Sequence, residues 1–352
     1  MSTPVTDATG TPQPASDPSV SEPSVSELAA PLVVRQRAGL ADYARRYAVV
    51  VLWLAMVLVF ALVQPDLFLR QGTVQIIFGA HGELVLLCLA LLCAFCVGEF
   101  DFSVASIMGL SGTTTAIMYT QHGWSVTAAA VFGLVLGVAA GAVNAFIVVT
   151  LGVDPIITTL GMATAIEGVA LWISNLSAVS GLPESLGNIA TDHVLGLPLF
   201  FWYGVVATLV FAYVLHGTAL GRHMSFVGAN REVARLAGVR VNRIRFGAFV
   251  FSGLLSGLAG VLLAANIGGF DPTSSATSLL PALAATFLGT AILMPGRFNP
   301  IGAWIAVFFL ETGIVGLQLL GLNGWISDVF FGGSLVVAVT VSTLLRRRGA
   351  RV

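Results

Sequence analysis

The chain has 352 residues, of which 57% are hydrophobic and only 9% are charged, and its formal net charge is -1 at pH 7. Soluble domains carry roughly 25% charged residues, so this composition excludes a water-soluble globular enzyme and predicts a polytopic membrane protein. All 16 basic residues are arginine, which also excludes a nucleotide-binding P-loop, since that motif ends in Gly-Lys-Ser or Gly-Lys-Thr.

The chain begins with a segment unlike the rest. Residues 1–30 are rich in Ser, Pro and Thr and precede the first apolar run, which predicts a disordered cytoplasmic tail and not a signal peptide. Residues 31–352 predict an all-α transmembrane domain, because a spanning helix needs about 20 apolar residues and such runs recur along the chain. The expected spans are 48–64, 74–97, 102–119, 126–151, 156–174, 199–215, 246–267, 279–294, 300–320 and 326–345.

Arginine placement provides an independent test of this count, because arginine-rich short loops stay in the cytoplasm. With ten spans and a cytoplasmic N-terminus, only Arg70 is extracytoplasmic, and both termini lie in the cytoplasm. The arginines placed on the cytoplasmic side are Arg35, Arg37, Arg45, Arg46, Arg222, Arg231, Arg235, Arg240, Arg243, Arg245, Arg297, Arg346, Arg347, Arg348 and Arg351.

Two short echoes indicate an internal duplication. GEFD at 98–101 recurs as GGFD at 268–271, an offset of 170, and LGVD at 151–154 is echoed by LGLN at 320–323, an offset of 169. In the ten-span topology the two members of each pair lie on opposite sides of the membrane. This is typical of an inverted repeat, here of spans 2–5 and 7–10; chance similarity among small residues is the alternative.

Several polar residues are candidates for a translocation pathway. Carboxylates are costly at the bilayer centre, so Glu99 and Asp101 should lie near an interface or line a watery cavity; the alternative is a polar turn that caps helices. Glu167 and Glu311 lie deeper in predicted spans, as proton-relay candidates or as groups satisfied by packed helices. The pathway candidates are Glu99, Asp101, Ser103, Asn144, Phe270 and Asp271.

Glycines at four-residue spacing predict close helix contacts. Gly133, Gly137 and Gly141 make one flat helix face. A second flat helix face is predicted from three further glycines. That second face consists of Gly253, Gly257 and Gly260.

The longest loop, 216–245, carries six arginines and one acidic residue, Glu232. Asn230 can cap a short helix from Arg231 to Ala237 that ends at Gly238. A short helix outside the membrane is typical of a docking element, and a plain charged loop is the alternative.

At this loop the chain resembles the permease subunits of sugar-type ABC importers, the branch with ribose, xylose, arabinose and galactose permeases. Residues 221–239 read GRHMSFVGANREVARLAGV, close to the family pattern GRxxYAIGGNxxAARLxGI. GEFDFSVAS at 98–106 and PIITTLG at 155–161 also resemble family motifs, and order and spacing agree over roughly residues 45–345. Phe102, Ala105 and Glu167 depart from the usual residues, and the last reverses a charge.

The resemblance implies a ten-span permease of the type II importer kind in a bacterial inner membrane, without an ATPase site or cofactor of its own. Its implied partners are a cytoplasmic ATP-binding subunit, an extracytoplasmic sugar-binding protein and a second permease copy, likewise in the lipid bilayer; nucleic acid is not among them. The implied function is import of a monosaccharide or related polyol by alternating access. By the same resemblance the coupling surface comprises Gly228, Asn230, Glu232, Ala234, Arg235 and Gly238.

A second hypothesis comes from a different class of transporter. The inverted repeat, together with Glu167 and Glu311, also suits a proton- or ion-coupled secondary transporter of a small polar solute. The arginine-rich loop favours the importer.

Overall fold

The computed structural model describes the backbone of residues 40–349 and the side chains of residues 46–340. The described residues belong to one compact unit. The predicted tail at 1–30 lies outside them, and so do several arginine side chains used in the topology argument: Arg35, Arg37, Arg45, Arg346, Arg347, Arg348 and Arg351.

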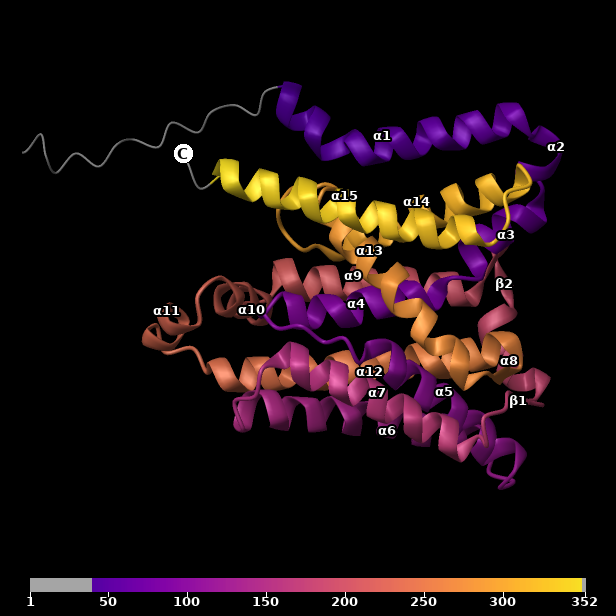
Figure 1. Cartoon of the computed structure of the whole chain (residues 1–352), viewed down its shortest axis with the longest axis horizontal. Helices are drawn as coiled ribbons and strands as arrows, with labels where there is room; N and C mark the ends of the chain where they lie inside the picture. The colour runs from indigo at the N-terminus through magenta and orange to yellow at the C-terminus, as the bar shows by residue number, and fades with distance from the viewer. Residues whose placement is uncertain (1–39, 350–352) are drawn as a thin grey trace, which may run out of the picture. The chain divides into compact units, whose positions relative to one another are not determined.

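Each predicted span contains at least one helix (Figure 1). Seven of the described helical segments are long and apolar enough to cross a membrane, whereas α5 and α13 are shorter, so the count of ten stays a prediction. The helices in these spans are α1 (Leu40–Val63), α3 (Gln71–Gly79) with α4 (Gly82–Phe95), α5 (Val104–Thr120), α6 (Val126–Ala145) continued by the π-helical turn Phe146–Thr150, α7 (Pro155–Ile173), α9 (Leu199–Gly217), α12 (Val241–Ile267), α13 (Leu279–Gly289), α14 (Pro300–Leu319) and α15 (Trp325–Gly349).

Short elements connect these helices. The strand β1 (Val179–Ser180) pairs antiparallel with the distant strand β4 (Gly269–Phe270), whereas β2 (His193–Val194) and β3 (Leu197–Pro198) form a local hairpin. The connecting elements are α2 (Pro65–Phe68), β1 (Val179–Ser180), α8 (Glu184–Thr191), β2 (His193–Val194), β3 (Leu197–Pro198), α10 (Ala219–Ala229), α11 (Arg231–Leu236), β4 (Gly269–Phe270) and the 3-10 helix η2 (Pro272–Ser278).

Two predicted spans differ from the structure. The run at 74–97 is interrupted between α3 and α4, where the backbone of His81, with φ of -118° and ψ of 28°, leaves the helical region. The run at 279–294 is helical only to Gly289. The chain then turns through Pro295 and Gly296, and the left-handed backbone of Gly296 is incompatible with a continuing helix.

The core forms around α12, which packs mainly against α6, α5 and α4. The predicted close contacts at these glycines are confirmed. Gly133 and Gly260 lie against α5, whereas Gly137 and Gly141 of α6 lie against Gly253 and Gly257 of α12: a Cβ on Gly253 would lie 2.4 Å from the carbonyl oxygen of Gly137. A Cβ on Gly141 would likewise lie 2.5 Å from the carbonyl oxygen of Phe249. Backbones at this separation exclude any side chain, so these glycines fix the α6–α12 interface.

The echoed sequences adopt matching turns. Gly98 and Gly268 both have left-handed backbones, with φ of 74° and 71°. Gly98 lies against Gly228 at the end of α10, whereas the second turn leads into β4 beside β1. Figure 1 shows α10 and β1 at opposite ends of the helical bundle, the arrangement that an inverted repeat produces.

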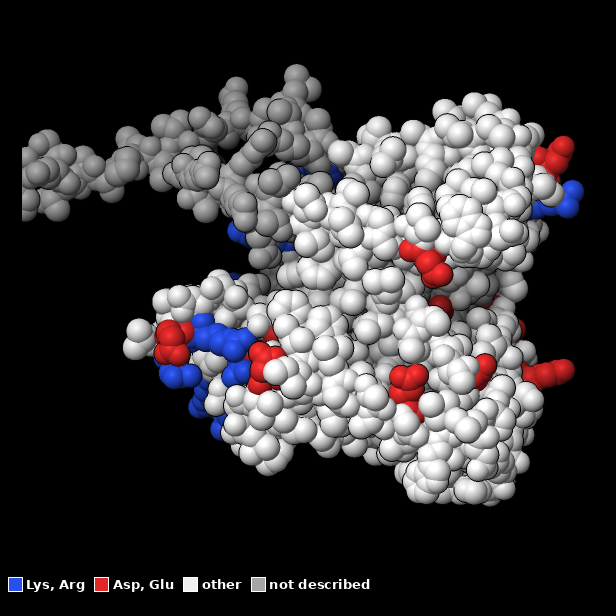
Figure 2. Space-filling model, in the orientation of Figure 1, with Lys and Arg blue, Asp and Glu red and all other residues white. Residues whose placement is uncertain are grey.

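Basic residues gather at the end of the bundle that carries α10 and α11, while acidic residues are more widely spread (Figure 2). Six arginines lie in the segment that begins with α10 and ends in the second turn of α12. Arg70, by contrast, precedes α3, near the opposite end. The uneven distribution of arginines between the two ends of the bundle agrees with the topology predicted from the sequence.

Candidate functional site

The predicted coupling segment is two short helices that extend beyond the bundle (Figure 1). Asn230 ends α10 and caps α11: its Oδ1 accepts hydrogen bonds from the backbone N–H groups of Glu232 and Val233, at 3.0 and 3.1 Å. Gly238 follows α11 with a φ of 80°. The predicted cap and stop of the short helix are thus confirmed, while the preceding helix α10 had not been predicted.

One face of α11 is attached and the other is free. Ala234 is fully buried, whereas Leu236 is 88% exposed and Val233 is 47% exposed. On the exposed side, Arg235 pairs with Glu232 at 3.6 Å, and both side chains are well exposed. An exposed apolar surface beside charges is typical of a surface that a partner covers.

The end of α10 is attached to the turn that follows α4. A Cβ on Gly228 would lie 2.4 Å from the carbonyl oxygen of Cys96, so only glycine allows the two backbones to approach this closely. The coupling segment therefore rests directly on the predicted carboxylate turn at 98–101.

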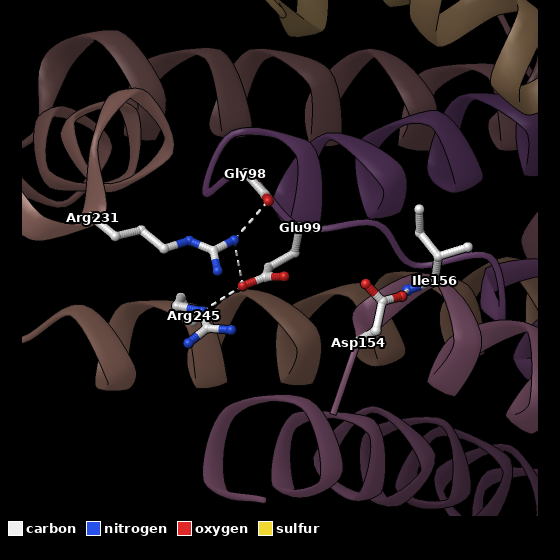
Figure 3. Close-up of polar contacts among 6 residues, drawn as sticks. All are labelled: Gly98, Glu99, Asp154, Ile156, Arg231 and Arg245. Carbon is white, nitrogen blue, oxygen red and sulfur yellow. Dashed lines mark hydrogen bonds and ion pairs between the residues drawn. The ribbon is translucent and has the colours of Figure 1, made fainter. Parts of the chain in front are cut away.

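Glu99 connects that turn to the first residue of α11 and to the beginning of α12 (Figure 3). Its Oε1 lies 2.9 Å from Nη2 of Arg231 and also accepts a short hydrogen bond from Nε of Arg245. Arg231 donates a further hydrogen bond, of 2.7 Å, to the carbonyl oxygen of Gly98. The Glu99 carboxylate is fully buried, and Arg245 is only 13% exposed. The pair is therefore shielded from water, and the loss of either partner would leave an uncompensated charge inside the protein.

Asp101 organises a second polar network a few residues further along the chain. Its Oδ1 accepts from the N–H and hydroxyl of Ser103, at 3.1 and 2.6 Å, and its Oδ2 accepts from the Ser252 hydroxyl at 2.8 Å. The Asn144 amide donates to the Ser103 hydroxyl at 2.7 Å. All four side chains are buried, so the network joins α6 and α12 to the start of α5.

Phe270 and Asp271 lie at the opposite end of the bundle from this network. Phe270 is buried in β4, and a Cβ on Gly112 of α5 would lie 2.3 Å from its ring. Asp271 caps η2, accepting from the N–H and hydroxyl of Thr273 at 2.9 and 2.7 Å. The pathway candidates therefore form two groups, and their role in a pathway stays a prediction.

A cleft of about 880 Å³ opens beside the coupling segment. Its lining combines the Phe95, Phe287 and Phe298 rings with Glu99 and residues of α10. The Phe95 ring packs on the other two, with centroids at 5.4 and 5.1 Å. Of the six pathway candidates, only Glu99 lines this cleft.

The deeper acidic residues differ from each other. Nε2 of His81 lies 3.1 Å from the buried Glu311 carboxylate, a side-chain partner that had not been expected from the sequence. Oε2 of Glu83 is buried without a partner among the described residues. Glu167 is only partly buried on α7.

Several important residues had not been singled out from the sequence. The partners of Glu99, namely Arg231 and Arg245, were counted only as loop arginines, and Ser252 was not considered. A buried carboxylate is stabilised by an opposite charge or by several hydrogen-bond donors, so the arginines of the following loop were the available signal for Glu99.

The comparisons with known proteins agree with this geometry. Residues 76–339 match the family described as branched-chain amino acid transport system / permease component. The chain belongs to this permease family. It is 30% identical over 325 residues to the L-arabinose ABC transporter permease protein AraH of Azospirillum brasilense, covering 92% of this chain and 95% of the relative.

Other relatives of this permease are import proteins with a different named cargo. The autoinducer 2 import system permease protein LsrC of Salmonella typhimurium is 31% identical, over 84% of this chain and 85% of the relative. LsrC of Photorhabdus laumondii is 32% identical, over 76% and 80%. No solved structure is significantly similar. The chain is thus a multi-pass membrane permease of the ABC-importer type.

Proposed function

We propose that this permease imports a monosaccharide or a related polyol by alternating access, powered by ATP hydrolysis in a separate cytoplasmic subunit. The α11 segment is the docking surface for that subunit. A second permease copy completes the pathway, and an extracytoplasmic sugar-binding protein delivers the substrate. The chain lies in a bacterial inner membrane with both termini in the cytoplasm, which the gathering of arginines at the α10–α11 end supports.

The proposal rests on the way α11 is connected to the bundle. Arg231 begins α11, and its guanidinium reaches both Glu99 and the Gly98 carbonyl. Glu99 also pairs with Arg245 of α12. A displacement of α11 by a moving partner would therefore displace the turn after α4 and the start of α12 together.

The adjacent Asp101 network would transmit that displacement to the helices of the bundle. Asp101 lies two residues after Glu99 and bonds to Ser103, at the start of α5, and to Ser252 in α12. Asn144 brings α6 into the same network. Because these groups are buried and mutually hydrogen-bonded, α5, α6 and α12 would move as one rigid group, the kind of motion that alternating access requires.

The substrate class follows from the relatives and from the matched motifs. Arabinose, named for the relative from Azospirillum brasilense, is a monosaccharide, and the chain resembles the sugar branch over its coupling loop. Because other relatives are named for the import of autoinducer 2, the proposed class includes compounds related to monosaccharides as well as the monosaccharides themselves.

Uptake in proteoliposomes tests this function. The permease, its ATP-binding subunit and its substrate-binding protein would be reconstituted with labelled arabinose and a set of related sugars. We expect uptake that needs ATP and the partner subunits and that survives a protonophore. Uptake by the permease alone, abolished by the protonophore, would establish the proton-coupled alternative instead.

A further inference from the structure

An apolar groove runs along the outside of the bundle between α9 and α12. Its volume is about 1040 Å³, and it is lined almost entirely by aliphatic and aromatic side chains. Val206 and Val210 of α9 form one wall and are more than half exposed, and Phe251 of α12, 44% exposed, lies on the other. Nothing in the proposed transport mechanism uses this surface.

The dimensions of the groove limit what can occupy it. Its α12 wall extends from Arg243 to Leu262, which is roughly 28 Å at 1.5 Å per residue and close to the thickness of a bilayer core. Acyl chains that lie along the bilayer normal can therefore contact the groove over its whole length, and its lining offers them almost only apolar contacts.

A single positive charge marks one end of the groove. Arg243 lines it at the start of α12, on the side of the bundle that carries α10 and α11, and is exposed. Within residues 46–340, Arg243 forms no ion pair, in contrast to Arg245, which is paired with Glu99. Arg222 and Arg240 are likewise exposed and without a carboxylate partner in that range.

We propose that this groove binds an anionic phospholipid, with its acyl chains between α9 and α12 and its phosphate at Arg243. Basic residues at the ends of clefts between transmembrane helices provide this recognition, because the phosphate remains at the membrane surface while the chains replace bulk lipid. The site holds a lipid as a structural ligand. It borders the coupling segment, because Leu220 and Met224 of α10 also line the groove.

Gly247 offers a direct way to fill the groove. It lines the cavity, and a Cβ added there meets no other atom within 4 Å. Gly247→Leu should therefore occupy lipid space without a clash inside the chain. Gly161→Leu is the matched control, because Gly161 is an exposed helix glycine of α7 with equally open space. Val210→Phe provides a second groove-filling variant if Gly247→Leu does not assemble.

The test is native mass spectrometry of the full chain from vesicles holding equal amounts of phosphatidylglycerol and phosphatidylcholine with the same acyl chains. We expect wild type and Gly161→Leu to retain phosphatidylglycerol, and Gly247→Leu or Val210→Phe to lose it. Arg243→Gln should reduce the preference for phosphatidylglycerol roughly fivefold. Inorganic phosphate should not displace the lipid.

Three results would overturn the proposal. Unchanged phosphatidylglycerol retention in both groove-filling variants would place the lipid elsewhere. An unchanged lipid preference in Arg243→Gln would show that this charge does not select the headgroup. Loss of the dimer in Gly247→Leu, with lipid retention intact, would identify a second copy as the occupant.

Discussion

The two echoed turns, at 98–101 and 268–271, share a backbone and differ in what they bind. In both, an aspartate oxygen accepts from the N–H and the hydroxyl two residues later: Asp101 from Ser103, and Asp271 from Thr273. The Asp101 carboxylate is buried and also reaches Ser252. Asp271 is only partly buried and caps η2.

The residue after the left-handed glycine makes the larger difference. At the first turn it is Glu99, which holds two arginines. At the second it is Gly269, whose backbone pairs with β1 so closely that a Cβ would lie 2.3 Å from the carbonyl oxygen of Val179. The first turn thus attaches the coupling segment to the bundle, whereas the second joins two stretches of backbone at the opposite end.

The largest effect is expected from Glu99→Gln. The amide keeps the shape but leaves Arg245, which is 13% exposed, as an unpaired buried cation, at a cost of about 3–5 kcal/mol in the free energy of unfolding. Arg231 is 38% exposed and can be rehydrated. Thermal unfolding of the purified permease and ATP-dependent uptake would both measure the loss.

Glu232→Gln is the matched control for Glu99→Gln. The Glu232–Arg235 pair lies on the surface of the same short helix, and its loss should cost less than about 0.5 kcal/mol. The double variant Glu99→Gln/Arg245→Gln should recover part of the stability. Equal destabilisation by the two glutamate variants would contradict the central position of Glu99.

A somewhat smaller effect is expected at the second turn. Gly269→Val places a side chain against the β1 backbone, and overpacking of this kind costs about 2–3 kcal/mol. Gly324→Val is the control, since a Cβ there meets nothing within 4 Å. Thermal unfolding should separate the two variants; equal melting temperatures would mean that the β1–β4 pairing is not needed for stability.

The two aspartates allow the most direct comparison of the turns. Asp101→Asn turns an acceptor into a donor where the Ser103 and Ser252 hydroxyls already donate, which should cost about 1–2 kcal/mol. Asp271→Asn should change stability by less than ~0.5 kcal/mol, because asparagine caps helices equally well. We also expect Asp101→Asn to lower uptake more than it lowers membrane assembly. Unchanged uptake would remove Asp101 from the pathway candidates.

Much of the architecture was predictable because its causes are local. Apolar runs marked every region where the structure has a long helix, glycine spacing marked the faces at which α6 and α12 meet, and Asn230 marked the start of α11. Each of these signals lies within a single continuous stretch of chain.

The contacts that define the site were not predictable in the same way. Glu99 and Arg245 are 146 residues apart, and no periodicity in either segment encodes their pairing. The pairing of His81 with Glu311 has the same character. The interruption between α3 and α4 was missed because His81 and Gly82 lie between strongly apolar residues, and the run remains hydrophobic on average across the break.

Gly238→Leu should have only a modest effect on stability and yet a large effect on coupling. Gly238 has a φ of 80° and open space around it, so a side chain there costs only the strain of a left-handed backbone, about 1–2 kcal/mol. The side chain would project from the end of α11, where the ATP-binding subunit is proposed to dock, and we expect ATP hydrolysis to continue while uptake falls. Gly238→Asn is the control, because asparagine tolerates this conformation and is smaller. If Gly238→Leu preserves the ratio of sugar imported to ATP hydrolysed, α11 is attached to the bundle for a reason other than docking.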